Sequence, residues 1–212
     1  MSKKLKLIGN IFLIAGSAVI LAGIILFAIN RYEDNNAANL SHTLTDAAKE
    51  MIAHDTDDPD SGELTVPEPD GSGPDAGTTS DLKVVGVNGY PCCGILTVPK
   101  IELEMVVFDT WNNDYLKKSL CRYQGSVNTD DLIIAGHNYK SSFGKLKKLT
   151  VGDVLYFTDM DGTTIEYVVK DIEVVGGTEI SRMISGDWDL TLYTCTYGGR
   201  DRLTVRCDRN NG

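Results

Sequence analysis

The sequence predicts a mostly β protein: a closed barrel of eight short strands with one or two short helices, preceded by an N-terminal transmembrane helix. From Lys83 onward, short apolar runs alternate with turn residues such as Asp161-Gly162, a pattern typical of small barrels. Before them, residues 7–29 form 23 nearly unbroken apolar positions. The first feature predicts the barrel, and the second predicts the membrane helix.

The apolar segment 7–29 is long enough to cross a bilayer as a helix. Three lysines lie within residues 1–6, so the positive-inside rule predicts a cytoplasmic basic tail and an extracellular remainder. A cleaved signal peptide is the alternative, but its apolar core is normally shorter, and no small-x-small site follows Phe27. We therefore interpret residues 7–29 as an uncleaved signal anchor of a single-pass membrane protein.

Residues 30–82 are predicted to hold a juxtamembrane helix and then an acidic linker. Over 30–53, apolar residues recur at three- and four-residue spacings, as on one face of a helix. They are Leu40, Leu44, Ala47, Ala48, Met51 and Ile52. The segment 54–81 holds four of the six prolines and nine acids, and it cannot bury enough apolar surface to offset its ordering entropy. As a flexible coil it would span on the order of 30 Å.

The formal net charge of −10 is concentrated ahead of the barrel. Residues 33–82 carry thirteen acids and one lysine, which gives −12, whereas residues 83–212 carry seventeen acids and fifteen bases, which gives −2. The predicted globular domain, residues 83–212, is therefore close to neutral. Nucleic-acid binding, which needs a basic surface, is not expected.

The barrel strands are predicted from short β runs in residues 82–207. These runs are 82–87, 94–98, 105–109, 132–135, 154–158, 164–173, 190–195 and 203–207. One helix is predicted over 114–121, capped by Asn112 or Asn113, and a shorter helical turn over 141–149.

Two predicted strands end in reactive side chains, and a third begins with one. The run 131–135 leads into Gly136-His137, the run 189–194 leads into Cys195, and Arg202 opens the last strand. A thiol needs a base or a cation to become a thiolate, and acyl transfer needs donors for an oxyanion. A thiol, an imidazole and a guanidinium on one rim supply both.

Cys195 is the candidate nucleophile, although a free cysteine is commonly a buried apolar filler. Strand alternation places it on one face with Thr191 and Tyr193, and the following Gly198-Gly199 turn predicts that it is accessible. His137 is the only histidine in residues 83–212 and therefore the candidate base. The two side chains either form a thiolate–imidazolium pair or stay mostly neutral, and the sequence leaves both open.

Four further cysteines leave the disulfide question open. Cys92, Cys93, Cys121 and Cys207 are an even number, compatible with two bridges or with reduced apolar fillers.

Among the arginines, Arg202 and Arg206 share one strand face. A single surface arginine on a terminal strand is usually only solubilising.

These residues resemble the sortases, the membrane-anchored cysteine transpeptidases of Gram-positive cell surfaces. The resemblance is carried by the TLxTC pattern at residues 191–195, by His137 at a strand end and by Arg202-Leu203. Further landmarks follow in the family's order: GILTVPK at 94–100, FGKL at 143–146, VGD at 151–153 and TDMDGT at 158–163. The resemblance covers roughly residues 83–209 and implies the family's eight-stranded barrel in residues 83–212.

The resemblance also implies an activity and its residues. Cys195 would attack a Thr–Gly-like bond in an LPxTG-like C-terminal sorting signal, with His137 as acid and base, mostly in the neutral state. Arg202 would hold the substrate backbone and the oxyanion, with Arg200 as the rival, and Ala135 and Thr194 would bind substrate. The partners are surface proteins that carry such signals, the membrane, and an amine from a peptidoglycan precursor or a pilin lysine.

No cofactor or metal is expected. Asp130-Asp131 lies where some sortases carry calcium-binding carboxylates, but two adjacent acids fall short of the six to eight oxygens that calcium takes. The absence of an Asp-Pro-aromatic lid and the fourteen residues between Val175 and Leu190 favour the housekeeping-like or class D types. The alternative functions are a membrane-bound cysteine protease that only hydrolyses, and a non-catalytic peptide-binding wall domain.

Overall fold

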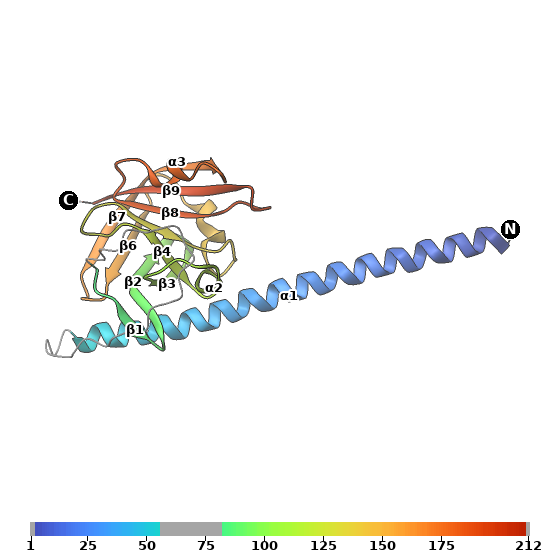
Figure 1. The fold of residues 1–212 in the computed structure, drawn as a ribbon, viewed down its shortest axis with the longest axis horizontal. Coiled ribbons are helices and arrows are strands. Elements are labelled where there is room, and N and C mark those ends of the chain that lie inside the picture. The colour runs from blue at the N-terminus through green and yellow to red at the C-terminus, as the bar shows by residue number, and fades with distance from the viewer. Residues whose placement is uncertain (1–2, 56–81, 211–212) are drawn as a thin grey trace. The chain divides into compact units, whose positions relative to one another are not determined.

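The computed structural model describes residues 3–55 and 82–210, shown in Figure 1. The chain divides into two compact units, Met1–Asn36 and Ala37–Gly212. Almost all of the predicted linker, residues 56–81, lies outside the described residues.

A single helix, α1, runs from Lys3 to Asp55 and joins the two segments that the sequence predicts as helical. It contains a stretch long and apolar enough to cross a membrane, with a mean hydropathy of 2.7 and none of that window buried. Large apolar side chains such as Phe12 and Phe27 are exposed there. This is the one such helix within residues 3–55 and 82–210.

The second unit is a closed barrel, as the sequence predicts (Figure 1). The strands are β1 (Val85–Val87), β2 (Tyr90–Val98), β3 (Leu103–Phe108), β4 (Leu120–Gln124), β5 (Leu132–Ala135), β6 (Val154–Asp159), β7 (Thr164–Gly176), β8 (Leu190–Cys195) and β9 (Asp201–Arg209). They pair in the order β1-β2-β3-β4-β5-β8-β9-β7-β6. Pairing of β2 with β6 closes the strands from β2 to β6 into a ring of eight, and β1 adds to the edge of β2.

The predicted helix over 114–121 is too long. Helix α2 covers only Asn113–Leu116, with the Asn112 side chain accepting from the Tyr115 amide at 2.8 Å as its cap. Leu120 and Cys121 instead pair in parallel with β3 and start β4, which the sequence reading missed. The eight predicted strands therefore included β1, which stands outside the closed ring, and lacked β4.

Three short helical segments connect other strands. The predicted turn over 141–149 is a 3-10 helix, η2, at Phe143–Lys148, and a second, η1, occupies Pro99–Ile101. Helix α3, Ile180–Ile184, lies in the connection between β7 and β8 and was not predicted.

The strands bury apolar side chains on both faces. One cluster fills the barrel interior and includes Leu96, Leu132 and Phe157. Two further clusters lie outside: one on β2 and β3 under the last turns of α1, and one on β5 and β8 next to α3. The barrel wall is thus covered in two places, and the second of these holds the candidate site.

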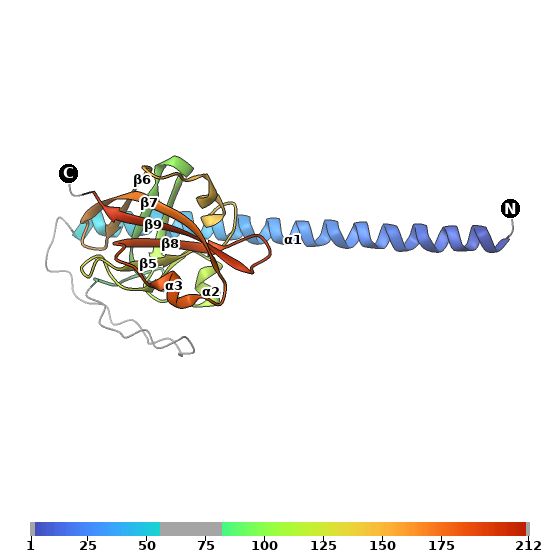
Figure 2. The same cartoon turned by 90° about the horizontal axis from the view of Figure 1, so that it is seen from above.

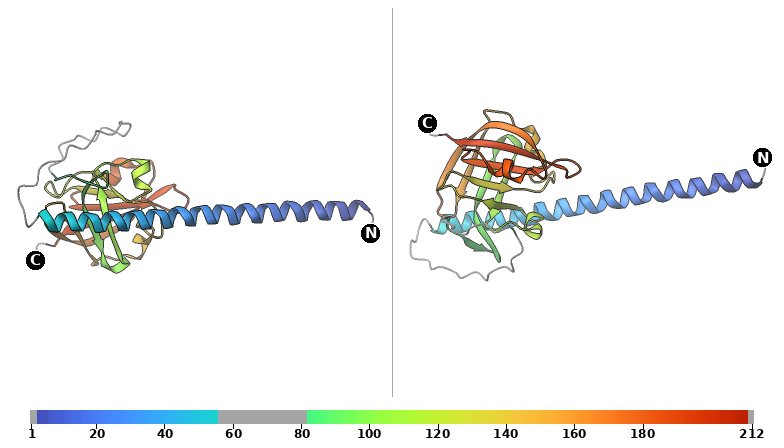
Figure 3. Two further views of the ribbon diagram at one scale, coloured as in Figure 1. Left: turned by 90° about the horizontal axis from the view of Figure 1, so that it is seen from below. Right: turned by 45° about the horizontal axis from the view of Figure 1, so that its top comes forward.

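The last turns of α1 are part of the barrel unit (Figure 3). Leu44 and Ala48 are fully buried against the outside of β2 and β3, so the predicted apolar face of this segment packs on the barrel. Between them, the Thr45 hydroxyl accepts from the Val106 amide at 2.9 Å and donates to the Ser41 carbonyl at 2.7 Å. The Ser119 hydroxyl donates to the Val106 carbonyl at 2.6 Å and lies 3.1 Å from the Ser41 hydroxyl.

Candidate active site

Three neighbouring strands, β5, β8 and β9, lie side by side (Figure 2). Cys195 and Arg202 lie on β8 and β9, and His137 follows the end of β5. Cys195 at the end of β8 pairs directly with Arg202 at the start of β9. On the other side, Ala135 of β5 pairs in parallel with Tyr193, and the Gly136 amide donates to the Tyr193 carbonyl at 3.1 Å. His137 follows Ala135 by two residues, as Cys195 follows Tyr193, so this register carries His137 to the level of Cys195.

These side chains belong to the outer face of the barrel. Leu190 and Leu192 of β8 point into the interior cluster, whereas Tyr193 packs outside, as the predicted alternation requires. Thr191 and Tyr193 are buried as well, because α3 and neighbouring aromatic rings cover this face. Cys195, at the strand end, is only half-buried. The outer face therefore carries a buried apolar cluster beside a more accessible thiol.

Cys195 differs from the other four cysteines in burial. All five are free thiols, but Cys92, Cys93, Cys121 and Cys207 are fully buried. Burial raises the pKa of the Cys92 and Cys121 thiols to about 12 and also raises the pKa of Cys93 and Cys207. Neutral, buried thiols are poor nucleophiles. Among the five, Cys195 is the thiol placed to react.

A disulfide between Cys92 and Cys121 does not fit the strand order. Cys92 on β2 and Cys121 on β4 both pair with Phe108, on opposite sides of β3. Two strand spacings are roughly 9.6 Å, which exceeds the ~7 Å limit between the Cα atoms of a disulfide. These two cysteines act as apolar fillers of the cluster under α1.

The backbone before His137 passes close under η2. A Cβ added to Gly136 would lie 2.4 Å from the Phe143 ring and 2.8 Å from Leu120, so only glycine fits at this position. The His137 ring, half-buried, stacks on the Tyr139 ring with centroids 4.0 Å apart. The tight packing of Gly136 sets where the strand ends, and the stacking orients the imidazole.

Arg202 is fixed by the hairpin that joins β8 to β9. Its Nη1 donates to the carbonyls of Gly199 and Asp201, each at 3.1 Å. The Thr196 amide donates to the Asp201 carbonyl at 2.9 Å, and Gly198 and Gly199 form the turn with φ of 93° and 72°. The side chain of Arg200 is exposed in this turn. The register thus places Arg202, rather than Arg200, beside Cys195.

The two predicted substrate-binding residues lie on different faces. Ala135 is buried on the outer face in one cluster with Tyr193. Thr194 pairs with Leu203 and shares the face of Leu192, so its side chain turns toward the barrel interior. Only the backbone of Thr194 faces a ligand on the outer side.

Side chains that the sequence reading did not assign to the site complete this face. Trp111 and Tyr123 meet edge to face with ring centroids 5.9 Å apart, and Tyr123 meets Tyr193 in the same way at 5.6 Å. On the other side, Met183 and Ile184 of α3 pack against the same cluster. We call this buried apolar packing on β5 and β8, between the aromatic rings and α3, the outer cluster. No motif marks it, because its members come from segments far apart in the chain.

The Asp130-Asp131 turn holds its carboxylates apart. Asp130 pairs with the Arg209 guanidinium at 2.7 Å, while Asp131 accepts from the Ser126 amide at 3.0 Å and from the Thr129 hydroxyl. Within the described residues, no three His, Cys, Asp or Glu side chains gather as metal ligands do. The turn is structured by its own hydrogen bonds.

Comparison with known proteins agrees with this geometry. The family profile described as "Sortase domain" matches residues 96–210, more than half of the chain. The chain belongs to the sortase family. Members of this family are cysteine transpeptidases, the enzyme class expected from the TLxTC pattern. No curated protein matches the chain significantly.

Solved sortases share the fold. Sortase A from Corynebacterium diphtheriae is 25% identical with a TM-score of 0.52, over 58% of this chain and 62% of that one, less than two thirds of its length. Sortase C1 of GBS Pilus Island 1 gives a TM-score of 0.58 at 21% identity, over 81% of this chain and 93% of that one. Sortase C from Clostridium perfringens SM101 gives a TM-score of 0.51 at 23% identity, over 84% of this chain and 92% of that one. The latter two show the fold alone.

Proposed function

We propose that this sortase is a single-pass membrane enzyme that cleaves an LPxTG-like C-terminal sorting signal and transfers the acyl group to an amine. The single observation that carries the proposal is the direct pairing of Cys195 on β8 with Arg202 on β9, with His137 two residues beyond Ala135, the β5 residue that pairs with Tyr193. The acceptor is the amine of a peptidoglycan precursor or of a pilin lysine.

The proposed chemistry follows from His137, Cys195 and Arg202. Cys195 Sγ attacks the carbonyl carbon of the Thr–Gly bond, and the oxyanion that forms is stabilised by the Arg202 guanidinium. His137 donates a proton to the leaving glycine amine as the C–N bond breaks, which leaves a thioester on Cys195. His137 then accepts a proton from the incoming amine, whose nitrogen attacks the thioester and releases the Cys195 thiolate, so that the thiolate and the imidazolium are both restored.

The length of β8 suits the part of the signal before the scissile bond. From Cys195 back to Thr191 is four residues of extended strand, about 13 Å. An extended Leu-Pro-x-Thr segment has the same length. The packing beside this strand is apolar, with Tyr193, Ala135 and Met183 in one buried cluster, which favours a signal with leucine and proline side chains.

The membrane topology rests on α1 and on the basic residues at its start. We assign residues 1–6 to the cytoplasm, 7–29 to the bilayer, 30–82 to the juxtamembrane region and 83–212 to the extracellular catalytic domain. A protease added to intact protoplasts is expected to release a soluble fragment that begins within residues 54–81. Full protection of the barrel would refute the external orientation.

A peptide assay tests the activity. The purified enzyme is incubated with an LPxTG peptide and an amine acceptor, and the products are read by mass spectrometry, with Cys195→Ala as the control. Ligated product supports the proposal. Free acid alone would identify a hydrolase with the same site, and unchanged peptide would identify a non-catalytic binding domain.

A further inference from the structure

The imidazole of His137 lies face to face with the ring of Tyr139, two residues further along the chain. The two ring centroids are 4.0 Å apart, and the ring planes are within 4° of parallel. Two neutral aromatic rings usually meet edge to face or offset, with centroids about 4.5–7 Å apart, because their negative faces repel each other. The five other ring pairs in the described part of the chain have centroids 5.1–5.9 Å apart. The pair of His137 and Tyr139 is therefore closer and flatter than two neutral rings prefer.

A positive charge on the imidazole removes this conflict. A cation within about 6 Å of an aromatic ring is attracted by the negative face of that ring. Histidine is the side chain that gains such a charge near neutral pH. The face-to-face geometry thus suits the imidazolium form of His137 better than its neutral form.

The backbone fixes Tyr139 to the core of the barrel. Its carbonyl accepts from the Ser142 amide at 3.1 Å and from the Gly144 amide at 3.0 Å. A Cβ added to Gly144 would lie 2.6 Å from the same carbonyl oxygen, so the chain passes too closely here for any other residue. Phe143 and Leu146 of η2 are fully buried in the interior cluster. The ring of Tyr139 is thus carried by an anchored segment.

The elements next to His137 bring mostly positive charge toward it. Asp201 and Arg202 open β9, and Arg202 pairs directly with Cys195. Lys140 is exposed in the loop that follows His137, and three lysines lie in the last turn of η2. Positive neighbours disfavour a further positive charge, whereas a thiolate on Cys195 favours it.

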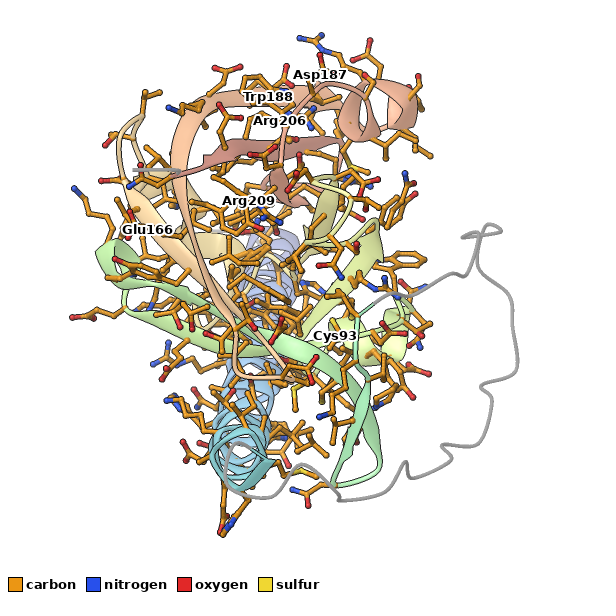
Figure 4. All side chains as sticks on the ribbon, turned by 90° about the vertical axis from the view of Figure 1, so that its left-hand side faces the viewer. Cys93, Glu166, Asp187, Trp188, Arg206 and Arg209 are labelled. Carbon is orange, nitrogen blue, oxygen red and sulfur yellow. The ribbon has the colours of Figure 1, made fainter. Side chains whose placement is uncertain are left out.

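The remaining charges on the neighbouring strands are paired with one another. Arg206 and Arg209 of β9, both marked in Figure 4, pair with Glu173 at 3.0 Å and with Asp130 at 2.7 Å. On β4, the Arg122 guanidinium pairs with Asp109 at 2.6 Å. The face of the Tyr139 ring is thus a group beside His137 that favours a proton on the imidazole without carrying a charge of its own.

We propose that the ring face of Tyr139 favours the imidazolium form of His137 and thereby maintains the acid that protonates the leaving amine. Of the two states that the sequence leaves open, the stack favours the thiolate–imidazolium pair. Tyr139 is a positioning residue, because it contacts His137 and none of the reacting atoms. The consequence for catalysis rests on the proposed function, whereas the effect on the imidazole does not.

The main test is a titration of the histidines by NMR. The full chain, labelled in its histidines and held in detergent micelles, contains three imidazoles, on His42, His54 and His137. A Cys195→Ala background keeps the thiol from titrating together with His137. The ring protons of His137 should lie upfield of the other two, because the stacked ring shields them. Tyr139→Leu should abolish this shift and lower the pH midpoint of His137 by about 0.4–1.5 pH units.

The kinetic test uses an LPxTG peptide at a pH above that midpoint, where the imidazolium population falls by the same factor. Tyr139→Leu should lower kcat about threefold to thirtyfold, with KM changed less than about twofold. Tyr139→Phe keeps the ring face and should restore both kcat and the midpoint. Tyr156→Leu is the matched control, because Tyr156 is a half-buried tyrosine on β6, which pairs with β2 and β7.

Three results would overturn the inference: no upfield shift of His137 in the wild type, an unchanged midpoint in Tyr139→Leu, or a Tyr139→Phe variant as impaired as Tyr139→Leu. Should Tyr139→Leu fail to fold, Tyr139→Trp should raise the midpoint, since tryptophan attracts cations more strongly. A wild-type enzyme that processes no peptide would instead refute the proposed function. The titration, which needs no peptide, would then decide the effect of Tyr139 on its own.

Discussion

The two covered faces of the barrel differ in how completely they are covered. On β2 and β3, the last turns of α1 bury Leu44 and Ala48 fully, and hydroxyls and backbone groups satisfy one another between helix and strand. On β5 and β8, the five-residue α3 covers less, and Cys195 and His137 stay half-exposed. The same architecture thus serves stability where the cover is complete and chemistry where it is partial.

The thiols show the same contrast. Cys92 and Cys121 lie in the cluster under α1, where burial raises their pKa to about 12. Cys195 lies at the end of β8, where it is only half-buried. Cysteine therefore acts as an apolar filler on one face and as the candidate nucleophile on the other. If this comparison is right, substitutions on the open face change activity at unchanged stability, and substitutions under α1 do the reverse.

After loss of the nucleophile in Cys195→Ala, the largest effect is expected for His137→Ala. Positioned acid–base groups contribute roughly 10²–10⁴-fold to turnover, and kcat/KM should fall by that factor while the melting temperature changes little. The wild-type rate should follow a bell-shaped pH profile. His42→Ala, an exposed histidine on α1, is the control and should be silent. A monotonic profile with a mildly impaired His137→Ala variant would remove His137 from the mechanism.

Arg202→Ala should lower turnover somewhat less than His137→Ala does. Removing a donor to an oxyanion typically lowers turnover by about 10²–10³-fold, and Arg202→Lys should restore little because lysine lacks the two-pronged donor. Arg200→Ala is the matched control, since that side chain is exposed in the neighbouring turn. Swapped kcat values for the Arg200 and Arg202 variants would move the assignment to Arg200.

Alkaline pH should destabilise the barrel through the thiols under α1. The pKa of Cys92 and Cys121 is raised from 9.0 to about 12 in the folded protein, so the unfolded chain loses these protons first. Stability is then fully present below pH 9 and falls as pH rises toward 12, by up to about 1.4 kcal/mol per pH unit for each thiol. Urea unfolding at pH 7.5 and 10.5 measures this, and a double alanine variant should lessen the loss. Equal urea midpoints at the two pH values would show that the folded barrel allows these thiols to ionise.

Thr45→Val tests the seam between α1 and β3. The change keeps the shape but leaves the buried Val106 amide without its acceptor, which should cost about 1–3 kcal/mol of stability. Activity below the melting transition should be unchanged. Thr43→Val is the control, because the Thr43 hydroxyl bonds back to Asn39 in solvent. Equal melting temperatures for the two variants would show that the hydrogen bond between Thr45 and Val106 contributes nothing to stability.

Sequence reading predicted most of what depends on local pattern. The bounds of β5 and β8 were predicted without error, because apolar runs ended at Gly136 and at Cys195, and these ends carry the candidate residues. Strand β4 was missed because its polar residues show no alternation, and pairing with β3 overrode the helical pattern that continued to Cys121.

Features that need a distant partner escaped prediction. The burial of Arg206 depends on carbonyls more than twenty residues away, and the outer cluster combines Trp111, Tyr123 and Met183 from separate segments. The apolar face of α1 was visible in the spacing of Leu44 and Ala48, but its partner, the outside of β2 and β3, was not.

The central claim is that the open face carries the reactive thiol, and trapping the acyl-enzyme tests it most directly. The wild-type enzyme is mixed with an LPxTG peptide, quenched in acid and mapped by mass spectrometry after digestion. We expect a thioester adduct on Cys195 alone, lost in Cys195→Ala and kept when Cys92 or Cys121 is replaced by alanine. An adduct on another cysteine, or turnover by Cys195→Ala near the wild-type rate, would contradict the account.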